Sequence, residues 1–190
     1  MSNKDIGIYM SILINPNCLI EESLKITILT SVAILSAIKS ICNLDVKLKW
    51  VNDIILNDLK VGGILCESQI NLNTNIIDNM IVGIGINVKK FDFPSSLKNI
   101  ATSIENNINN NISRNKLISE IINFFDSYFL EKEDYFKIYK ENSYVLGKEI
   151  SVIQNDEQFN AKAIDIDDNG SLIVQAQDKI IKLISSDISI

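Results

Sequence analysis

The sequence has no histidine, one arginine (Arg114) and three cysteines among its 190 residues. Without histidine, a Ser-His-Asp triad, a Cys-His pair and any histidine metal site are excluded within this chain. Cys18, Cys42 and Cys66 are far apart, odd in number and form no Cys-x-x-Cys motif. We therefore interpret them as reduced thiols of a cytoplasmic protein, not as disulfides or metal ligands.

Targeting and membrane signals are also missing from the sequence. Met1–Asp5 is polar and no cleavage-type segment follows it, so we expect no signal peptide. The longest nearly apolar stretch, Ile26–Ile38, is too short to span a bilayer and contains threonine and serine. The formal net charge of −6 disfavours a nucleic-acid-binding face. These features predict a soluble, cytoplasmic protein without a membrane segment.

The residues that are present predict a globular protein with a real core, since 46% are hydrophobic and 22% are charged. Hydrophobic periodicity predicts strands at Ile8–Ile14, Val46–Trp50, Ile54–Leu56, Val61–Glu67 and Met80–Val88. A tight turn at Asn57-Asp58 is expected to join the third and fourth of them. Helices are predicted at Glu21–Cys42 and, in one or two pieces, at Arg114–Tyr139. The apolar run of Met80–Val88 suggests burial on both faces. We interpret Asn106–Asn111 as a solvated loop.

The pattern changes near Gly147 to short strands separated by turn signals. The expected strands are Lys148–Ile153, Phe159–Ile166, Ser171–Ala176 and Lys179–Ile184. Asp168-Asn169-Gly170 predicts a tight hairpin, because Asn-Gly supplies the positive φ that such a turn requires. These residues predict a small β-barrel that leans on the main domain.

Lysine, amide, acidic and glycine residues gather at the predicted strand ends. They occur in the runs Lys49-Trp50-Val51-Asn52-Asp53, Lys60-Val61-Gly62-Gly63-Ile64-Leu65-Cys66-Glu67 and Gly83-Ile84-Gly85-Ile86-Asn87. Glycines let the backbone approach a ligand closely, and a terminal amide can read a nucleobase edge. Each feature alone has an ordinary structural interpretation, such as a solvated lysine, a backbone cap or tight packing. Their order and spacing together favour a functional site.

That order resembles the central signature of biotin–protein ligases. The run KWVNDI…LKVGGILCE…VGIGINV is similar to the family's KWPNDI…KxxGIL.E…GIGiN, with Val51 where the family usually has proline. Gly7–Ser11 is similar to the preceding strand, and Ala101-Thr102-Ser103 to an ATSL-like segment. The resemblance covers nearly the whole chain. It implies an α+β fold with a mixed β-sheet and helices on one face in residues 1–143, and an SH3-like β-barrel in residues 144–190.

The resemblance implies ATP-dependent activation of biotin to biotinyl-5'-AMP and its transfer to a lysine of a biotin carboxyl carrier protein. Lys60 would be the catalytic residue, neutralising the negative charge where the biotin carboxylate meets the α-phosphate. The implied biotin-binding residues are Lys60, Gly62, Gly63, Gly83 and Gly85. The implied ATP- or adenylate-binding residues are Lys49, Trp50, Asn52, Asp53, Asn87 and Asp187. Asp53 would also help to place a Mg²⁺ ion carried by ATP.

Two family motifs have no match in the sequence: a DSTN-like strand end and the GRGRxGR loop that closes over biotinyl-AMP. In relatives this loop precedes the segment that matches Ser2-Asn3-Lys4, and the sequence starts just after it. The single arginine cannot replace the loop, and an N-terminal DNA-binding domain also has no match. Because lost transition-state donors cost about 10²–10³ in rate each, we expect weak or no ligase activity from this chain alone. We interpret it as a truncated, split or misannotated-start product.

Two other functions remain open at this point. A lipoate–protein ligase shares the core fold and the NDI-plus-lysine signature, although Gly62–Glu67 and the terminal β-module favour biotin. A non-catalytic fragment or binding module of the same fold is favoured by the missing loop. Relatives often pair through their sheets, so a homodimer through the sheet is a further possibility.

Overall fold

The computed structural model describes residues 6–71, 73–130, 134–154 and 156–190. Ser2-Asn3-Lys4, which the resemblance places next to the arginine-rich loop, lies outside the described residues. The elements are β1 (Gly7–Ile14), β2 (Cys18–Leu19), η1 (Ile20–Glu22), α1 (Ser23–Cys42), β3 (Lys47–Lys49), β4 (Asp53–Leu56), β5 (Leu59–Asn71), β6 (Ile76–Asn87), η2 (Ile104–Asn106), α2 (Arg114–Leu130), α3 (Tyr135–Glu141), β7 (Glu149–Gln154), β8 (Glu157–Ile166), β9 (Leu172–Ala176), β10 (Lys179–Leu183) and β11 (Asp187–Ser189).

The first sheet has the strand order β1-β6-β5-β4-β3, with β2 paired to β6. Each described strand pairing in it is antiparallel, and parallel pairing is limited to two isolated bridges. The resemblance implied a mixed sheet, and these antiparallel pairings correct that expectation. The physical reason is that β3, β4, β5 and β6 follow one another through short turns, and strands joined by short turns pair antiparallel. The predicted turn at Asn57-Asp58 is present, with positive φ at both residues.

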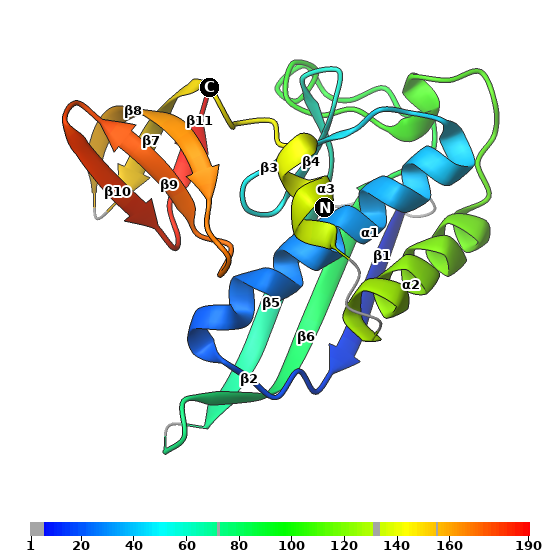
Figure 1. Ribbon diagram of the computed structural model, residues 1–190. Coiled ribbons are helices and arrows are strands. Elements are labelled where there is room, and N and C mark those ends of the chain that lie inside the picture. The colour runs from blue at the N-terminus through cyan, green and yellow to red at the C-terminus, as the bar shows by residue number, and fades with distance from the viewer. Residues whose placement is uncertain (1–5, 72, 131–133, 155) are drawn as a thin grey trace.

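Helices α1 and α2 cover one face of this sheet, as expected (Figure 1). Helix α1 is buried almost all round, because the sheet lies on one side and α2 and α3 pack on the other. Its buried hydroxyls are satisfied within the helix: Thr30 donates to the Ile26 carbonyl and Ser31 to the Thr27 carbonyl. Helix α1 begins at Ser23, after a 3-10 turn, and so starts two residues later than predicted.

The helical segment Ile20–Cys42 is long and apolar enough, by length and composition, to cross a membrane. The expectation that no apolar segment reaches that length is therefore wrong. About two thirds of its apolar window (67%) is nevertheless buried inside the protein. This burial is that of the central core helix of a soluble fold.

The sequence predicted that both faces of β6 are buried, but the structure buries only one of them. Met80, Val82, Ile84 and Ile86 are buried beneath the helices. On the opposite face Ile81 is 44% exposed, and no described helix covers this side of the sheet. The strand is apolar on both faces, but only one has a layer above it, so the run of apolar residues misled the prediction. The other face is available for a ligand.

The C-terminal sheet has the order β10-β9-β8-β7-β11. Its strands confirm the four predicted ones and add β11, which was too short and polar to be recognised. No pairing between the edge strands β10 and β11 is described, so the expected barrel is an open five-stranded sheet that is consistent with an SH3-like domain. The boundary between residues 143 and 144 stays a prediction.

Candidate functional site

A β-bulge in β5 sets the direction of Lys60. The register between β4 and β5 skips one residue at Val61. By strict alternation Lys60 would share the buried face of Gly62. The extra residue instead places Lys60 on the helix-free face with Gly63, while Val61 is fully buried. Bulges beside functional sites often redirect a side chain in this way.

Lys60 forms an ion pair with Asp53, whose strand β4 lies next to β5. The Lys60 ammonium contacts the Asp53 carboxylate, and the lysine side chain is 45% exposed against 21% for the aspartate. A Cβ added to Gly63 would lie 3.2 Å from Lys60 Cε and 3.6 Å from Asp53 Oδ1. Gly63 therefore leaves the space through which the lysine side chain reaches the carboxylate.

The helix-free face of the sheet contains a hollow of about 450 Å³ beside Lys60. This volume is within the usual range for small-molecule sites. The lining comes from three neighbouring strands and from Asn52, which precedes β4. It includes Tyr9, Ser11, Asn52, Lys60, Gly63, Gly83 and Gly85. The structure therefore brings together Lys60 and three of the four glycines predicted to bind a ligand.

Gly62 is placed differently from the other glycines. It is buried on the opposite face, where an added Cβ would approach the Gly85 carbonyl oxygen to 2.8 Å. Its missing side chain allows close packing of β5 against β6. The structure does not bring the Gly62 Cα to the hollow.

A second, larger cavity of about 640 Å³ lies between the two sheets. Asp53 and Asn52 line it from the first domain, together with Lys49. Asp187 lines it from the C-terminal sheet, together with Gln154 and Ser186. A third cavity of about 400 Å³ is lined by Lys49, Asp53 and Lys60. Lys49, Asp53 and Lys60 therefore lie where the hollows meet.

Asn52 fixes the loop that joins these cavities. Its backbone carbonyl accepts from the Ile64 amide at 2.9 Å, and its side-chain amide donates to the Ile64 carbonyl at 3.2 Å. These two bonds continue the pairing of β5 where β4 begins. Asn52 thus has the backbone-capping role considered for it, and it also lines both larger cavities.

Trp50 holds the two domains together. It is 3% exposed, and its indole N–H donates to the Gly170 carbonyl at 2.9 Å. Gly170 lies at the predicted hairpin with φ +89°, in contact with Leu24 and Ile28 of α1. A second interdomain contact is the ion pair of Lys140 with Asp165 at 2.8 Å. The ring of Trp50 also borders the interdomain cavity.

Asn87 ends β6 on the same face as Gly83 and Gly85 by strand alternation. Its side-chain amide donates to the Thr102 carbonyl at 3.1 Å. It is not among the residues that line the hollow beside Lys60. The structure therefore places Asn87 at the rim of the site, tied to the segment that follows it.

Sequence patterns left Tyr9 and Ser11 unassigned, although both line the hollow. They pair with Gly85 and Gly83 across the β1–β6 ladder and alternate with the buried or half-buried residues of β1. Period-2 alternation opposite the glycines is the signal that could have found them. The cysteines are free, and burial raises the pKa of all three thiols. This disfavours a nucleophilic thiolate.

The arrangement offers an ammonium and a carboxylate at the edge of a glycine-floored hollow, next to a polar interdomain cavity. Such a site can hold an apolar ring system on the sheet and an anion at the lysine. Among the described residues, no group of three or more cysteine, aspartate or glutamate side chains is placed to hold a metal ion by itself.

Comparison with known proteins agrees with this arrangement. Residues 2–87 match the biotin/lipoate A/B protein ligase family, and residues 145–190 match the biotin protein ligase C terminal domain. The chain is 30% identical over 199 aligned residues to the bifunctional ligase/repressor BirA of Bacillus subtilis, covering 100% of this chain and 60% of that protein. A 64-residue stretch is 44% identical to biotin–protein ligase 1, chloroplastic, of Arabidopsis thaliana, covering 30% of this chain and 17% of that protein.

Solved structures show the same fold. The crystal structure of the biotin protein ligase from Aquifex aeolicus has a TM-score of 0.83 at 23% identity and covers 98% of this chain and 84% of that one. The structure of that ligase with biotin and ATP has a TM-score of 0.75 at 23% identity, covering 96% and 77%. The present chain spans about 60% of the length of the Bacillus relatives it matches.

Proposed function

Because the chain belongs to the biotin protein ligase family, we propose that its site activates biotin with ATP to biotinyl-5'-AMP and transfers the biotinyl group to a lysine of a biotin carboxyl carrier protein. The observation that carries the proposal is the β-bulge at Val61. It directs the Lys60 ammonium into the hollow whose floor carries Gly63, Gly83 and Gly85.

Lys60 acts at the step in which negative charge accumulates. When the biotin carboxylate attacks the α-phosphate, anionic oxygens converge, and a fixed ammonium stabilises them without reorganising. The contact with Asp53 holds the ammonium before the ligand arrives. The glycines of the floor let the flat ureido ring of biotin lie on the sheet.

The nucleotide lies between the domains in this proposal. Lys49 and Asp53 line the interdomain cavity, and Asp187 faces them from the C-terminal sheet. Asn87, at the rim, offers its amide to adenine, and Trp50 supports the cavity by fixing the domain contact. A Mg²⁺ ion bound by phosphates commonly uses only one or two protein carboxylates, so Asp53 fits this role.

The proposed second step is the transfer of the biotinyl group to the carrier protein. A carrier lysine would attack the acyl group of biotinyl-AMP and release AMP, so no covalent enzyme intermediate is required.

The free cysteines support a reducing, cytoplasmic location.

The 190-residue chain by itself is proposed to be a weak ligase. Its only arginine, Arg114, donates to the Gly7 carbonyl at 3.1 Å. A phosphate in the proposed site would meet the lysine point charges of Lys49 and Lys60 and not the bidentate contacts that guanidinium groups supply.

Biotin-dependent exchange of pyrophosphate into ATP tests the activation step. We expect exchange that is slow in the wild type and lower by about 10²-fold or more in Lys60→Ala. Lys98→Ala, which changes an exposed lysine paired with Asp92, is the control and should leave the rate unchanged. Exchange that depends on lipoate instead of biotin would assign a lipoate–protein ligase, and equal rates in both variants would contradict the role of Lys60.

A further inference from the structure

Residues 100–107, here called the bracket, join Lys60 to Asn87. The Lys60 backbone N–H donates to the Ile100 carbonyl at 2.8 Å, and the Thr102 N–H donates to the Lys60 carbonyl at 2.9 Å. The Thr102 carbonyl in turn accepts from the Asn87 side-chain amide at 3.1 Å. The bracket thus contacts the backbone of one proposed ligand-binding residue and the side chain of another.

The bracket takes the place of a missing strand beside Lys60. The pairing of β5 with β6 extends only to Gly62, so β6 does not reach the Lys60 backbone. The isolated parallel bridge between Lys60 and Ala101 fills this position. On its other side Lys60 pairs with Ile55 of β4, directly beside the register shift at Val61. The bracket therefore supplies the backbone contacts on the β6 side, and the direction of Lys60 depends in part on how firmly the bracket is held.

Asn107 fixes the bracket internally and to the β4–β5 turn. Its amide nitrogen donates to the Thr102 hydroxyl at 3.0 Å and to the Ser103 carbonyl at 2.8 Å. Its amide oxygen accepts from Asn57 in the turn at 2.9 Å. Asn106 and Asn109–Asn111 are exposed, as expected of a solvated loop. The side chains of Asn106 and Asn107 in addition make specific bonds that composition does not reveal.

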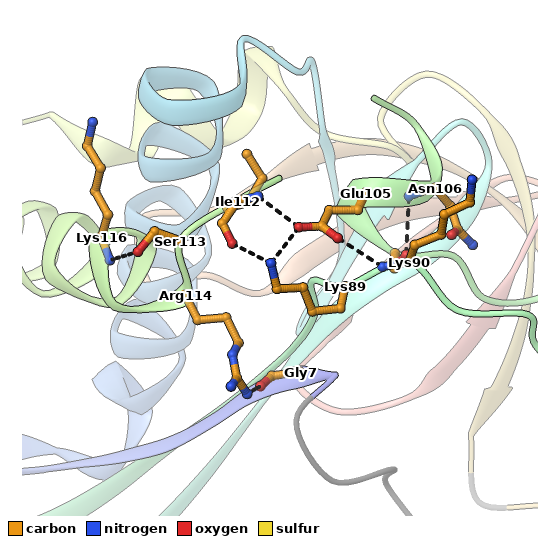
Figure 2. Close-up of polar contacts among 10 residues, drawn as sticks. Gly7, Lys89, Lys90, Glu105, Asn106, Ile112, Ser113, Arg114 and Lys116 are labelled. Carbon is orange, nitrogen blue, oxygen red and sulfur yellow. Dashed lines mark hydrogen bonds and ion pairs between the residues drawn. The ribbon is translucent and has the colours of Figure 1, made fainter. Parts of the chain in front are cut away.

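Glu105 anchors the bracket to the rest of the protein (Figure 2). Its side chain is 7% exposed, and Oε1 accepts from Lys89 Nζ at 2.8 Å and from the Ile112 N–H at 2.8 Å. Oε2 accepts from the Lys90 N–H at 3.1 Å. Burial alone would raise the pKa of this carboxyl, but the bonds from Lys89, Ile112 and Lys90 outweigh burial and lower it.

The Glu105 backbone adds a second attachment, because its N–H donates to the Val88 carbonyl at 2.9 Å, directly after Asn87. Lys89 also donates to the Ile112 carbonyl at 2.9 Å. One buried carboxylate therefore joins the end of β6, the bracket and the segment that leads into α2.

We propose that Glu105 is a positioning residue of the ligase site: it holds the bracket, and through the bracket it sets the geometry of Lys60 and Asn87. The inference rests on the proposed function of Lys60. It assigns to Glu105 a role in turnover, since a displacement of about 1 Å in a reacting group can cost about 10²-fold in rate.

The test compares Glu105→Ala and the conservative Glu105→Gln with a matched control. Asp92→Asn removes an exposed ion pair, Lys98–Asp92 at 3.2 Å, from the same connecting segment. Two kinds of measurement are made on each 190-residue chain under conditions where it is folded. The first gives kcat and KM for biotin in pyrophosphate exchange, and the second gives the hydrogen-exchange rates of the Lys60 and Thr102 amides.

In Glu105→Ala we expect kcat to fall by about 10- to 100-fold with a much smaller change in KM, and both amides to exchange at least about tenfold faster as the bracket opens locally. Glu105→Gln keeps an acceptor and should recover part of both effects, and Asp92→Asn should match the wild type. If Glu105→Ala does not fold, the comparison of Glu105→Gln with Asp92→Asn decides the question.

A folded Glu105→Ala variant with wild-type kcat and wild-type amide protection would overturn the inference. An equal loss in Asp92→Asn would overturn it too, because the effect would then not be specific to the buried carboxylate. If the wild-type chain by itself shows no biotin-dependent exchange, which the unmatched arginine-rich loop allows, amide protection decides. Unchanged exchange rates of the Lys60 and Thr102 amides in folded Glu105→Ala would then overturn the inference.

Discussion

At the scale of single residues, Gly63 and Lys60 depend on each other. The missing side chain of Gly63 leaves room for the lysine Cε, which an added Cβ would approach to 3.2 Å. Because the neighbour is the end of a flexible side chain, the fold can tolerate the change while the ammonium moves. A side chain added at Gly63 should therefore reduce activity more than it reduces the stability of the fold.

Gly63→Ala is accordingly predicted to remain folded with a thermal midpoint close to wild type and to lose about 10²-fold in kcat for pyrophosphate exchange. Gly85→Ala is the control, since its Cβ would meet the Tyr9 ring at 3.8 Å and the Gly63 carbonyl oxygen at 4.0 Å, both ordinary contact distances. That change fills part of the hollow without touching Lys60, so it should raise KM for biotin more than it lowers kcat. A wild-type kcat in Gly63→Ala would contradict this geometry.

Tyr139 carries a buried hydroxyl that makes no hydrogen bond within the described residues. Burial raises its pKa strongly, and the residue is fully inaccessible to solvent. Because an unpaired buried hydroxyl is unfavourable, Tyr139→Phe is predicted to increase the free energy of unfolding by about 1 kcal/mol. Urea denaturation measures the change.

Tyr128→Phe is the matched control for this prediction. Tyr128 is 5% exposed, and its hydroxyl shares a hydrogen bond of 3.0 Å with Ser36. Its removal should decrease the free energy of unfolding by about 1 kcal/mol. A decrease in the free energy of unfolding in both variants would contradict the prediction and show that the Tyr139 hydroxyl has a partner.

At the scale of elements, the hairpin between β8 and β9 connects the domains through close packing. Gly170 has φ +89°, and an added Cβ would lie 2.7 Å from Ile28 and 3.0 Å from Leu24. Gly147 has a similar φ of +82° with nothing within 4 Å. Alanine substitutions at the two positions therefore distinguish the cost of a positive φ, which both share, from the cost of a steric clash, which only Gly170 has.

Gly170→Ala is predicted to destabilise the protein by about 1–3 kcal/mol more than Gly147→Ala, since both incur the left-handed strain but only the first overpacks the interface. Trp50 is the only tryptophan and donates to the Gly170 carbonyl. Its fluorescence should therefore shift to the red in Gly170→Ala alone. Identical spectra and stabilities for the two variants would refute the interface role of the hairpin.

Elements with strong periodicity were predictable from the sequence, and their irregularities were not. The helix ending at Cys42 and the turn at Asn57-Asp58 carried clear local signals. The bulge at Val61 did not, because a skipped residue is set by the neighbouring strand and not by local preference. Sequence alternation alone would have placed Lys60 on the wrong face of the sheet.

Long-range contacts account for what else the sequence did not reveal. The nucleotide-binding role of Trp50 stays a prediction, but the motif could not show that its N–H bonds to Gly170, 120 positions away. Glu105 was not singled out, since its partners Lys89 and Ile112 meet it only in the folded protein. Such contacts decide which residues of a motif face the ligand and which hold it in place.

At the scale of the whole molecule, the helix-free face of the first sheet carries exposed apolar side chains beyond the hollow. Leu13 is 68% exposed on β1, and Ile81 is 44% exposed on β6. Exposed apolar positions on a sheet favour association between chains. We propose that this face would form the contact in a homodimer through the sheet, the possibility raised by the sequence.

Leu13→Lys is therefore predicted to shift the protein toward monomer in sedimentation velocity. Leu130→Lys is a close control, because Leu130 is 69% exposed but lies at the end of α2, away from the sheet. An equal effect of the two substitutions, or monomeric wild-type protein at high concentration, would rule out association through this face.

The central claim is that the Lys60 ammonium meets the anionic junction of an acyl-adenylate. The most direct measurement is the affinity of a non-hydrolysable biotinyl-adenylate analogue for three proteins: the wild type, Lys60→Met and Lys98→Met as a surface control. Lys60→Met removes the ammonium group and keeps an unbranched side chain of similar length. We predict that Lys60→Met weakens binding by about 10²-fold, or close to 3 kcal/mol, while Lys98→Met leaves it unchanged. Equal affinity of the wild type and Lys60→Met for the analogue would contradict the account.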